Sequence, residues 1–212
     1  RKQMKKITEL NPNFVLDSSA YNGLIDFDAL FGRVAPLQIE IGSGKGTFLI
    51  SQAVAFPETN FLGIEWARKY YRYAADRIAR HGLGNVRLLR DDAANFLREH
   101  VADGAVERFH IYFPDPWPKA RHNKRRLIGE ENMPEFYRTL APGGVLNIAT
   151  DHPDYFEQME QVLLRGKMSH LFEKIDFTRP AGARDGEMTG TNFERKYLVE
   201  GRVTNTIAVR KI

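Results

Sequence analysis

The sequence predicts an α/β protein built on a doubly wound, mostly parallel sheet. Short apolar runs with the alternation typical of strands recur along the chain, and segments with helical spacing separate them. Strands that alternate with helices favour parallel pairing through helical crossovers. The run at residues 37–41 also leads into a glycine-rich turn and a helix, an arrangement that places ligands at the carboxyl edge of such a sheet.

The composition indicates one domain of moderate size. The chain has 212 residues, 42% of them hydrophobic, and a chain of this length buries a sizeable core. Residues 1–36 carry no periodic pattern and have a basic start. We expect them to form an N-terminal arm that packs on the domain or is partly disordered beside it. Residues 37–212 are expected to form the domain.

Charge and cysteine content limit the classes of function. The chain has no cysteine, which excludes disulfides and thiolate metal sites, and no apolar run approaches the length of a membrane span. We therefore expect a cytoplasmic protein that uses neither a metal nor a membrane. The net charge of +4 favours a polyanionic partner. The sequence leaves open whether the protein is a monomer or a homodimer.

The elements follow one another in a regular order. The seven predicted strands are residues 37–41, 60–64, 86–89, 108–113, 144–150, 172–177 and 203–210. Helices are expected at residues 47–55 and 66–81, after Asp92, before Leu140 and at residues 155–164. Gly82 suits the end of the second helix, and a Pro-Gly-Gly turn precedes the fifth strand.

Gly42, Gly44 and Gly46 form the turn after the strand at residues 37–41. Glycine at alternate positions permits positive φ and lets a ligand approach the backbone without meeting a Cβ. The spacing GxGxG does not match the GxGxxG of a dinucleotide site, and Lys45 is not followed by the Ser or Thr of a P-loop. For the glycines alone, an ordinary tight turn is the alternative interpretation.

Three acids stand at or near predicted strand ends. Glu40 interrupts an apolar strand, where a carboxylate repels a pyrophosphate but attracts the ammonium of an amino acid. Glu65 ends the next strand, where an acid accepts hydrogen bonds from ribose hydroxyls. Asp92 is either a helix N-cap or a neighbour of an adenine pocket, and both interpretations stay open. Together with the glycine turn, Glu40 and Glu65 favour a nucleoside cofactor.

The most specific stretch is residues 113–126, FPDPWPKARHNKRR. Pro114 and Pro116 restrict the backbone on either side of Asp115 and so fix where its carboxylate points. A rigid acid, an aromatic side chain and a run of cations suit the binding of a purine inside a phosphate backbone. A solvated loop is the alternative. The cations of this basic tract are Lys119, Arg121, Lys124, Arg125 and Arg126.

Taken together, these motifs resemble the bacterial tRNA (guanine-N7)-methyltransferase family, which belongs to the class I S-adenosylmethionine-dependent methyltransferases. The resemblance rests on EIGSGKG, GIE at residues 63–65, DDA at 91–93, FPDPWPKARHNKRR, TDH at 150–152 and TNFE at 191–194. It implies a Rossmann-like class I fold with a seven-stranded sheet whose last strand runs antiparallel. It also implies methyl transfer from S-adenosylmethionine to N7 of a guanine in the tRNA variable loop.

The resemblance implies roles for individual residues and makes Asp115 the active-site acid. The predicted cofactor contacts are Glu40, Gly42, Gly44, Gly46, Glu65, Asp92 and Ala93. The predicted tRNA contacts are the basic tract from Lys119 onwards together with Asp151, Thr191, Asn192, Phe193 and Glu194. A strand-end turn is the local alternative for Asp151. For residues 191–194 the alternative is a helix N-terminus, because Thr191 and Glu194 have the spacing of a capping box.

The chemistry of the reaction is consistent with these roles. Guanine N7 carries an in-plane lone pair and is unprotonated at neutral pH, so it needs no general base and positioning dominates. Asp115 would stabilise the cation that develops on the purine and accept hydrogen bonds from guanine N1–H and N2–H. Asp151 or Glu194 would share this recognition, and the sequence does not divide the work among the three acids.

Other classes of function fit less of the sequence. A small-molecule methyltransferase shares the cofactor features but has no use for the basic tract. A non-catalytic RNA-binding module tolerates loss of Glu40 and Glu65, and this chain retains both. The Tyr-xxx-Lys of short-chain dehydrogenases and the Asn-Pro-Pro-aromatic turn of amino-methyltransferases do not occur in the sequence.

Overall fold

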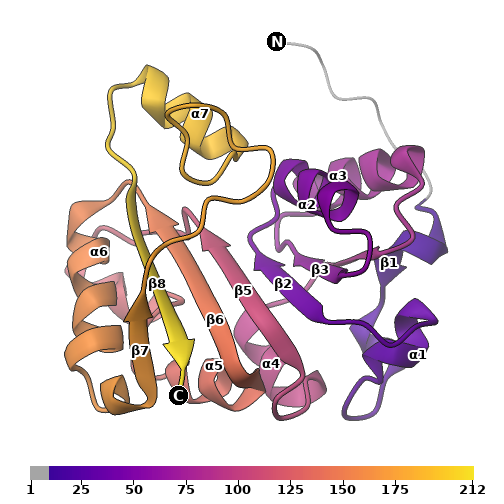
Figure 1. Ribbon diagram of the computed structural model, residues 1–212, viewed down its shortest axis with the longest axis horizontal. Helices are drawn as coiled ribbons and strands as arrows, with labels where there is room; N and C mark the ends of the chain where they lie inside the picture. The colour runs from indigo at the N-terminus through magenta and orange to yellow at the C-terminus, as the bar shows by residue number, and fades with distance from the viewer. Residues whose placement is uncertain (1–9) are drawn as a thin grey trace.

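The computed structural model describes residues 10–212 and confirms the predicted fold class (Figure 1). Helices pack on both faces of one mostly parallel sheet. The basic first residues of the predicted arm lie outside the described part of the chain. Short 3₁₀ helices also occur, at Pro12–Phe14, Ser18–Ala20, Ala120–Arg125 and Ser169–Leu171.

Within residues 10–212 the sheet has eight strands in the order β1-β4-β3-β2-β5-β6-β8-β7. The strands are β1 (Val15–Leu16), β2 (Leu37–Ile41), β3 (Asn60–Ile64), β4 (Val86–Leu89), β5 (Val106–Tyr112), β6 (Leu140–Thr150), β7 (Phe172–Ile175) and β8 (Asn205–Lys211). Neighbours pair in parallel except around β8, which runs antiparallel to both β6 and β7. The predicted antiparallel last strand is therefore confirmed.

The predicted number of seven strands is wrong by one, because β1 joins the edge of the sheet. Val15 pairs with Leu88, and Leu16 pairs with Leu89, in parallel. Two residues are too short to show the alternation that identifies a strand in a sequence. The same region contributes helix α1 (Phe27–Phe31), whose two phenylalanines are buried in the main core. Residues 10–36 thus pack closely on the sheet.

Alternate side chains of the strands supply two cores, one on each face of the sheet. Phe61 and Leu88 pack with helices α2 (Thr47–Ala55) and α3 (Arg68–His81). The adjacent residues Leu62 and Leu89 belong to the larger core on the other face. The helices of that face are α4 (Ala93–His100), α5 (Met133–Thr139) and α6 (Pro153–Glu160), and a π-helical turn, Gln161–Arg165, continues α6.

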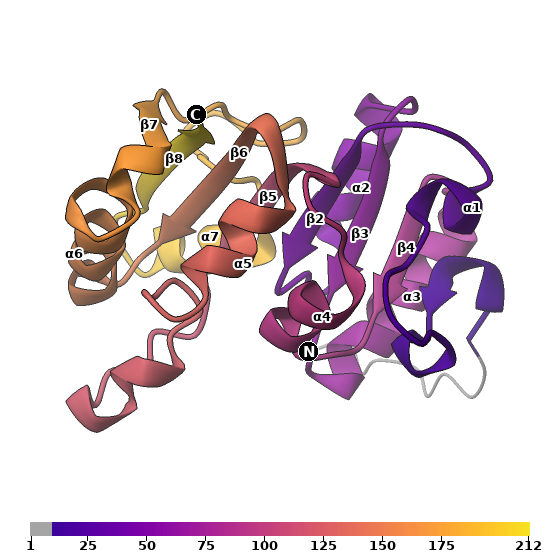
Figure 2. The same cartoon turned by 90° about the horizontal axis from the view of Figure 1, so that it is seen from below.

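Two segments leave this layered body near the carboxyl ends of the parallel strands. Helix α7 (Asn192–Val199) lies above those ends in Figure 1. The segment around the 3₁₀ helix Ala120–Arg125, which follows β5, projects away from the sheet in Figure 2. The predicted functional motifs therefore gather at one edge of the sheet, as expected for open α/β sheets.

Candidate active site

A cavity of about 370 Å³ lies where the carboxyl ends of β2 and β5 meet α7. Its lining combines the end of β2, the glycine turn and the start of α2 with side chains from α3, β5 and α7. The lining residues are Glu40, Gly42, Ser43, Gly44, Lys45, Thr47, Phe48, Tyr70, Tyr112, Thr191, Asn192, Phe193 and Lys196. Acidic, basic, hydroxyl and aromatic groups thus face one space, which suits an amphipathic ligand.

The glycine turn has the backbone geometry that its sequence predicts. Gly42 and Gly44 have φ of 82° and 53°, and a Cβ on Gly42 would meet no atom within 4 Å. These two glycines line the cavity. Gly46 instead lies against α3. A Cβ at this position would be 3.1 Å from the Cβ of Ala74. Its proximity to α3 serves the packing of α2 against that helix.

Glu40 is the most unusual group in the cavity. Its side chain is buried, with 4% of the residue exposed, and its Oε2 atom has no hydrogen-bond partner among the described residues. Burial, and secondarily the nearby Glu65, raise the pKa of Glu40 well above its usual value. A buried carboxyl without a partner is costly, and a cationic ligand group would relieve that cost.

Glu65 holds the glycine turn against the end of β3. Its Oε2 atom accepts a hydrogen bond of 2.7 Å from the N–H of Gly44, and its Oε1 atom accepts one of 2.7 Å from the N–H of Ala67. The sequence motif did not reveal this contact. Each carboxylate oxygen retains a second acceptor site, so the predicted contact to ribose hydroxyls is compatible with the geometry.

Asp92 and Ala93 lie at the start of α4, at the same edge of the sheet. Asp92 is the N-cap, and its side chain accepts a hydrogen bond of 3.0 Å from the N–H of Asn95. The structure therefore contains the capping interaction that was one of the two open interpretations, and the exposed carboxylate remains accessible. Ala93 is buried and packs in the main core.

Asp115 lies exposed on a loop whose backbone is strained on both sides of it. Phe113 and Trp117 are the two residues other than glycine with positive φ in the described chain, at 54° and 42°. Such conformations cost energy and persist where the surroundings impose them. The N–H of Phe113 donates to Ala149 O over 2.7 Å, and its ring packs edge-on against Tyr197 of α7. The carboxylate of Asp115 is thus presented from a fixed backbone.

The basic tract divides into exposed cations and one buried cation. Lys119, Arg121, Lys124 and Arg125 are exposed on the projecting segment. The guanidinium of Arg125 lies 5.0 Å from the centre of the Trp117 ring. This cation–π contact packs Arg125 against the loop that contains Asp115.

Arg126 is the buried member of the tract, and its predicted role as a phosphate contact stays a prediction. It is only 4% exposed. Its Nε donates to Pro116 O over 2.8 Å, and its Nη1 donates to Gln158 Oε1 of α6 over 2.6 Å. Its guanidinium also stacks on Tyr155. Arg126 therefore ties the loop of Asp115 to α6.

Asp151 follows β6 and forms an ion pair. Arg202 Nη1 donates to its Oδ2 over 2.7 Å, and the guanidinium of Arg202 lies over the ring of Tyr197. Its side chain is 13% exposed. The ion pair thus links the end of β6 to the segment after α7. A small part of the Asp151 side chain stays exposed to solvent.

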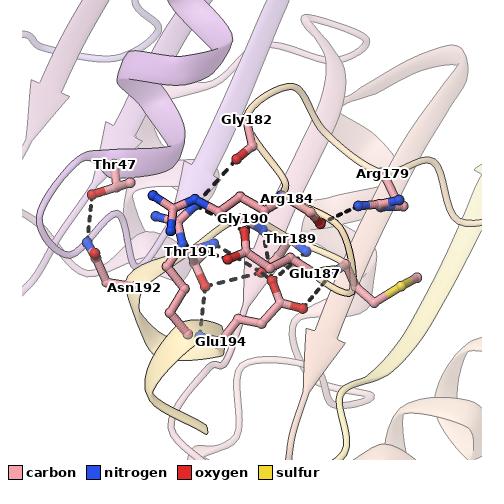
Figure 3. A network of polar contacts seen from close by, with 12 residues as sticks. Thr47, Arg179, Gly182, Arg184, Glu187, Thr189, Gly190, Thr191, Asn192 and Glu194 are labelled. Carbon is pink, nitrogen blue, oxygen red and sulfur yellow. Dashed lines mark hydrogen bonds and ion pairs between the residues drawn. The ribbon is translucent and has the colours of Figure 1, made fainter. Parts of the chain in front are cut away.

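Glu194 is the centre of the polar network drawn in Figure 3 and is fully buried. Its Oε1 accepts from the N–H of Met188, and its Oε2 accepts from the N–H groups of Thr189 and Gly190 and from the Thr189 hydroxyl. With this burial and these donors, Glu194 organises the loop before α7. The predicted contact of Glu194 with tRNA stays a prediction.

Thr191, Asn192 and Phe193 line the cavity, and their predicted contact with tRNA stays a prediction. Thr191 caps α7 by accepting from the N–H of Glu194 over 3.2 Å, which is half of the predicted capping box. Asn192 donates to the Thr47 hydroxyl over 2.6 Å (Figure 3). The start of α7 is thus attached to the start of α2 across the cavity.

Several lining residues were not predicted from the sequence. Phe48, Tyr70, Tyr112 and Lys196 lie outside the motifs or at their margins. Tyr112 had one signal, because it directly precedes residues 113–126 on a strand that ends at the cavity. The other side chains come from helices, where spacing shows which face is apolar but not what lies opposite it.

Residues 10–212 offer neither a metal cluster nor a membrane-spanning helix. No cluster of three or more His, Cys, Asp or Glu side chains there is arranged to hold a metal ion. No helix in the same part of the chain is both long and apolar enough to cross a membrane.

Comparisons of the sequence identify similar proteins over nearly the whole chain. A family model described as a putative methyltransferase matches residues 34–204. The tRNA (guanine-N(7)-)-methyltransferase of Alkalilimnicola ehrlichii is 38% identical over 213 residues, which cover 99% of this chain and 86% of that protein. The protein of the same description from Rhodopirellula baltica is 44% identical over 192 residues, with coverage of 88% and 70%.

Comparisons of the structure show the same fold in distant proteins. The aminoglycoside resistance methyltransferase NpmB1 superposes with a TM-score of 0.59 at 15% identity and covers 88% of this chain and 92% of that one. A SAM dependent methyltransferase from Aquifex aeolicus gives a TM-score of 0.56 at 12% identity, with coverage of 84% and 82%. At these identities the likeness concerns the fold alone.

Proposed function

The chain belongs to the tRNA (guanine-N7)-methyltransferase family, and we propose that its cavity binds S-adenosylmethionine while Asp115 receives a guanine of the tRNA variable loop. The enzyme transfers the methyl group of S-adenosylmethionine to N7 of a guanine in tRNA. The observation that supports our assignment of the cavity is the buried Glu40 carboxyl, whose Oε2 atom has no partner within the described residues.

The residues around the cavity suit S-adenosylmethionine in their chemistry. When bound, this cofactor supplies an electrophilic methyl group on a sulfonium. Glu40 offers its unpartnered oxygen to the ammonium of the methionine moiety, because a nearby cation favours the ionised carboxyl. Glu65 holds the N–H of Gly44 and offers its remaining acceptor sites to the ribose hydroxyls. Asp92 stands exposed at the next strand end, towards the adenine.

Asp115 acts on the guanine. Guanine N7 needs no base, so the role of the protein is to orient the ring and to stabilise the positive charge that develops on it. A carboxylate accepts from both N1–H and N2–H of guanine, and adenine lacks this pair of donors. The strained backbone at Phe113 and Trp117 keeps the carboxylate in one direction, which reduces the reorganisation required during the reaction.

The exposed cations on the projecting segment bind the tRNA backbone in this proposal. Lys119, Arg121, Lys124 and Arg125 contact phosphates, and Asp151 lies at the rim of the site beside Tyr197. Phosphate contacts fix the position of a nucleic acid without reading its sequence. The choice of guanine therefore depends on Asp115 and its neighbours. We place the reaction in the cytoplasm, where the substrate tRNA is found.

Mapping of the methylated nucleotide tests this proposal. The purified protein is incubated with labelled S-adenosylmethionine and bulk tRNA from cells that lack the modification. We expect the label at N7 of one guanine in the variable loop. Label at another position would overturn the assignment of the variable loop. Failure of the protein to bind S-adenosylhomocysteine would overturn the assignment of the cavity.

A further inference from the structure

Four side chains of β2 and β5 form a continuous series of hydrogen bonds that ends at the cavity. Gln38 Nε2 donates to Glu107 Oε2 over 2.8 Å. The other amide atom of Gln38, Oε1, lies 2.8 Å from His110 Nε2. His110 Nδ1 lies 2.9 Å from the hydroxyl of Tyr112, which lines the cavity. The series thus runs from the exposed Glu107 to the ligand space.

The chemistry of these groups fixes the direction of every bond in the series. An ionised carboxylate only accepts, so Glu107 requires the amide nitrogen of Gln38 on its side. Gln38 therefore presents its oxygen to His110, whose Nε2 must carry the proton. The neutral imidazole then has a lone pair on Nδ1, and this atom accepts from the Tyr112 hydroxyl.

The surroundings of His110 keep its ring neutral. Burial, and secondarily Arg108, lower the pKa of His110 well below its usual value. The ring of Phe48 packs against the imidazole with 4.6 Å between ring centres. A protonated ring would have a donor at Nδ1 and would reverse the bond to Tyr112, so the neutral form preserves the direction of the series.

The result is that the hydroxyl hydrogen of Tyr112 is directed away from the cavity. A hydroxyl has one donor and two acceptor sites, so its acceptor sites remain available to a ligand. Tyr112 and Glu40 therefore present acceptor atoms to the cavity, while the cations Lys45 and Lys196 also line it.

We propose that Tyr112 accepts a hydrogen bond from the amino group of the methionine moiety of S-adenosylmethionine, beside Glu40, and that Glu107, Gln38 and His110 keep its oxygen an acceptor. This inference rests on the proposed function. The methionine moiety carries an ammonium and a carboxylate, and an acceptor atom rejects the carboxylate. The series therefore determines which end of the amino acid faces the sheet, and Gln38 and His110 are positioning residues.

The first test compares two ligands in the Tyr112→Phe variant. Calorimetry measures binding of S-adenosylhomocysteine and of its analogue without the amino group. We expect the variant to bind S-adenosylhomocysteine about ten- to a hundredfold more weakly, the range for a hydrogen bond to a charged group. Its affinity for the analogue should match the wild type. Equal losses for both ligands, or no loss for either, would overturn the proposal.

The second test reverses the series at a residue that does not line the cavity. Gln38→Lys places a donor opposite His110 Nε2, so Nδ1 should carry the proton and the Tyr112 hydroxyl should turn its hydrogen to the cavity. The double variant Gln38→Glu, Glu107→Gln keeps an acceptor opposite His110, supplies it with a donor at position 107, and is the matched control. At pH 8, ¹⁵N NMR of the His110 ring should show the Nδ1–H tautomer only in Gln38→Lys, with about tenfold weaker binding of S-adenosylhomocysteine.

The outcomes separate this inference from the proposed function. If the wild-type protein binds S-adenosylhomocysteine and methylates tRNA, but Gln38→Lys shows the Nδ1–H tautomer with unchanged affinity, the role of Tyr112 is overturned and the proposed function stands. An unchanged tautomer in Gln38→Lys would equally overturn the directed series. If the wild-type protein does not bind S-adenosylhomocysteine, the proposed function itself fails.

Discussion

The Oε2 atom of Glu65 accepts a hydrogen bond of 2.7 Å from the backbone N–H of Gly44. The side chain at the end of β3 therefore sets the conformation of the glycine turn after β2, twenty-one residues earlier in the chain. Gly44 has positive φ and lines the cavity, so this acid contributes to the shape of the cavity.

We predict that Glu65→Gln lowers both stability and cofactor affinity. The amide must place its NH₂ group against the N–H of either Gly44 or Ala67, which leaves a buried donor without a partner. That costs about 1–3 kcal/mol of unfolding free energy. Urea unfolding of the ligand-free protein measures the loss. A variant with weaker binding of S-adenosylhomocysteine but wild-type stability would show that these hydrogen bonds of Glu65 do not stabilise the ligand-free protein.

We predict that Glu40→Gln stabilises the ligand-free protein at neutral pH while it weakens cofactor binding. Burial, and then Glu65, raise the pKa of Glu40, so the folded state holds this proton more tightly than the unfolded chain. The stabilisation from this proton is complete below the pKa of the unfolded chain, near 4.5, and is lost as the pH rises through the folded pKa. Glutamine has no such proton to lose.

Urea unfolding at a series of pH values compares the two proteins. The stability difference in favour of Glu40→Gln should grow upwards from about pH 4.5, by at most about 1.4 kcal/mol per pH unit. Other titrating groups are common to both proteins and cancel in the comparison. A difference that stays constant with pH would contradict the raised pKa, and unchanged binding of S-adenosylhomocysteine would remove Glu40 from the cofactor site.

The sequence predicted which residues lie at the edge of the sheet better than it predicted the contacts of their side chains. Strand alternation and glycine spacing located Glu40, Glu65 and the glycine turn at one edge of the sheet, because these are local patterns. Arg126 and Glu194 stand in equally specific motifs, yet both are buried. Their partners decide this, and Gln158 lies thirty-two residues from Arg126 in the chain.

The series of hydrogen bonds from Glu107 to Tyr112 is a second feature that the sequence did not predict. It joins β2 to β5 across seventy-two residues, between Gln38 and His110, and no motif contains it. The direction of these hydrogen bonds follows from Glu107, which can only accept. It therefore depends on contacts that exist only in the folded chain. Sequence spacing indicates the face of a strand that a residue occupies, but it does not pair that residue with a partner on the next strand.

We predict that Arg125→Ala changes the salt dependence of tRNA binding but not stability, whereas Arg126→Ala lowers stability but not this salt dependence. Arg125 is exposed, so its loss should leave stability within about 0.5 kcal/mol and reduce the log–log salt slope of tRNA binding by about 0.7–0.9. Arg126→Ala leaves two half-buried acceptors, Pro116 O and Gln158 Oε1, without their donor. It should cost about 1–3 kcal/mol for each acceptor left unpaired.

Binding of tRNA at several salt concentrations, together with urea unfolding, separates the two profiles. Arg126→Ala, measured at a temperature where it is folded, should keep the wild-type salt slope. A reduced slope in that variant would return Arg126 to the phosphate surface. A wild-type slope in Arg125→Ala would make the exposed part of the basic tract a solvated loop.

The last prediction concerns Asp115, where guanine recognition and charge stabilisation meet. Asp115→Asn keeps the shape of the side chain but removes its charge and turns a donor towards the donors of guanine. Turnover at saturating tRNA should fall by about two to three orders of magnitude, the range for loss of a well-placed electrostatic group. Stability should stay within about 0.5 kcal/mol, because the carboxylate is exposed and has no hydrogen bond within residues 10–212.

Affinity for S-adenosylhomocysteine discriminates between the possible roles of this acid. It should change less than about threefold in Asp115→Asn, since Asp115 does not line the cavity that contains Glu40. Near wild-type turnover would reduce Asp115 to a turn residue between two strained neighbours. Lost cofactor binding with intact stability would instead place its carboxylate at the cofactor. Only a fall in turnover at unchanged cofactor affinity and stability assigns it to the guanine.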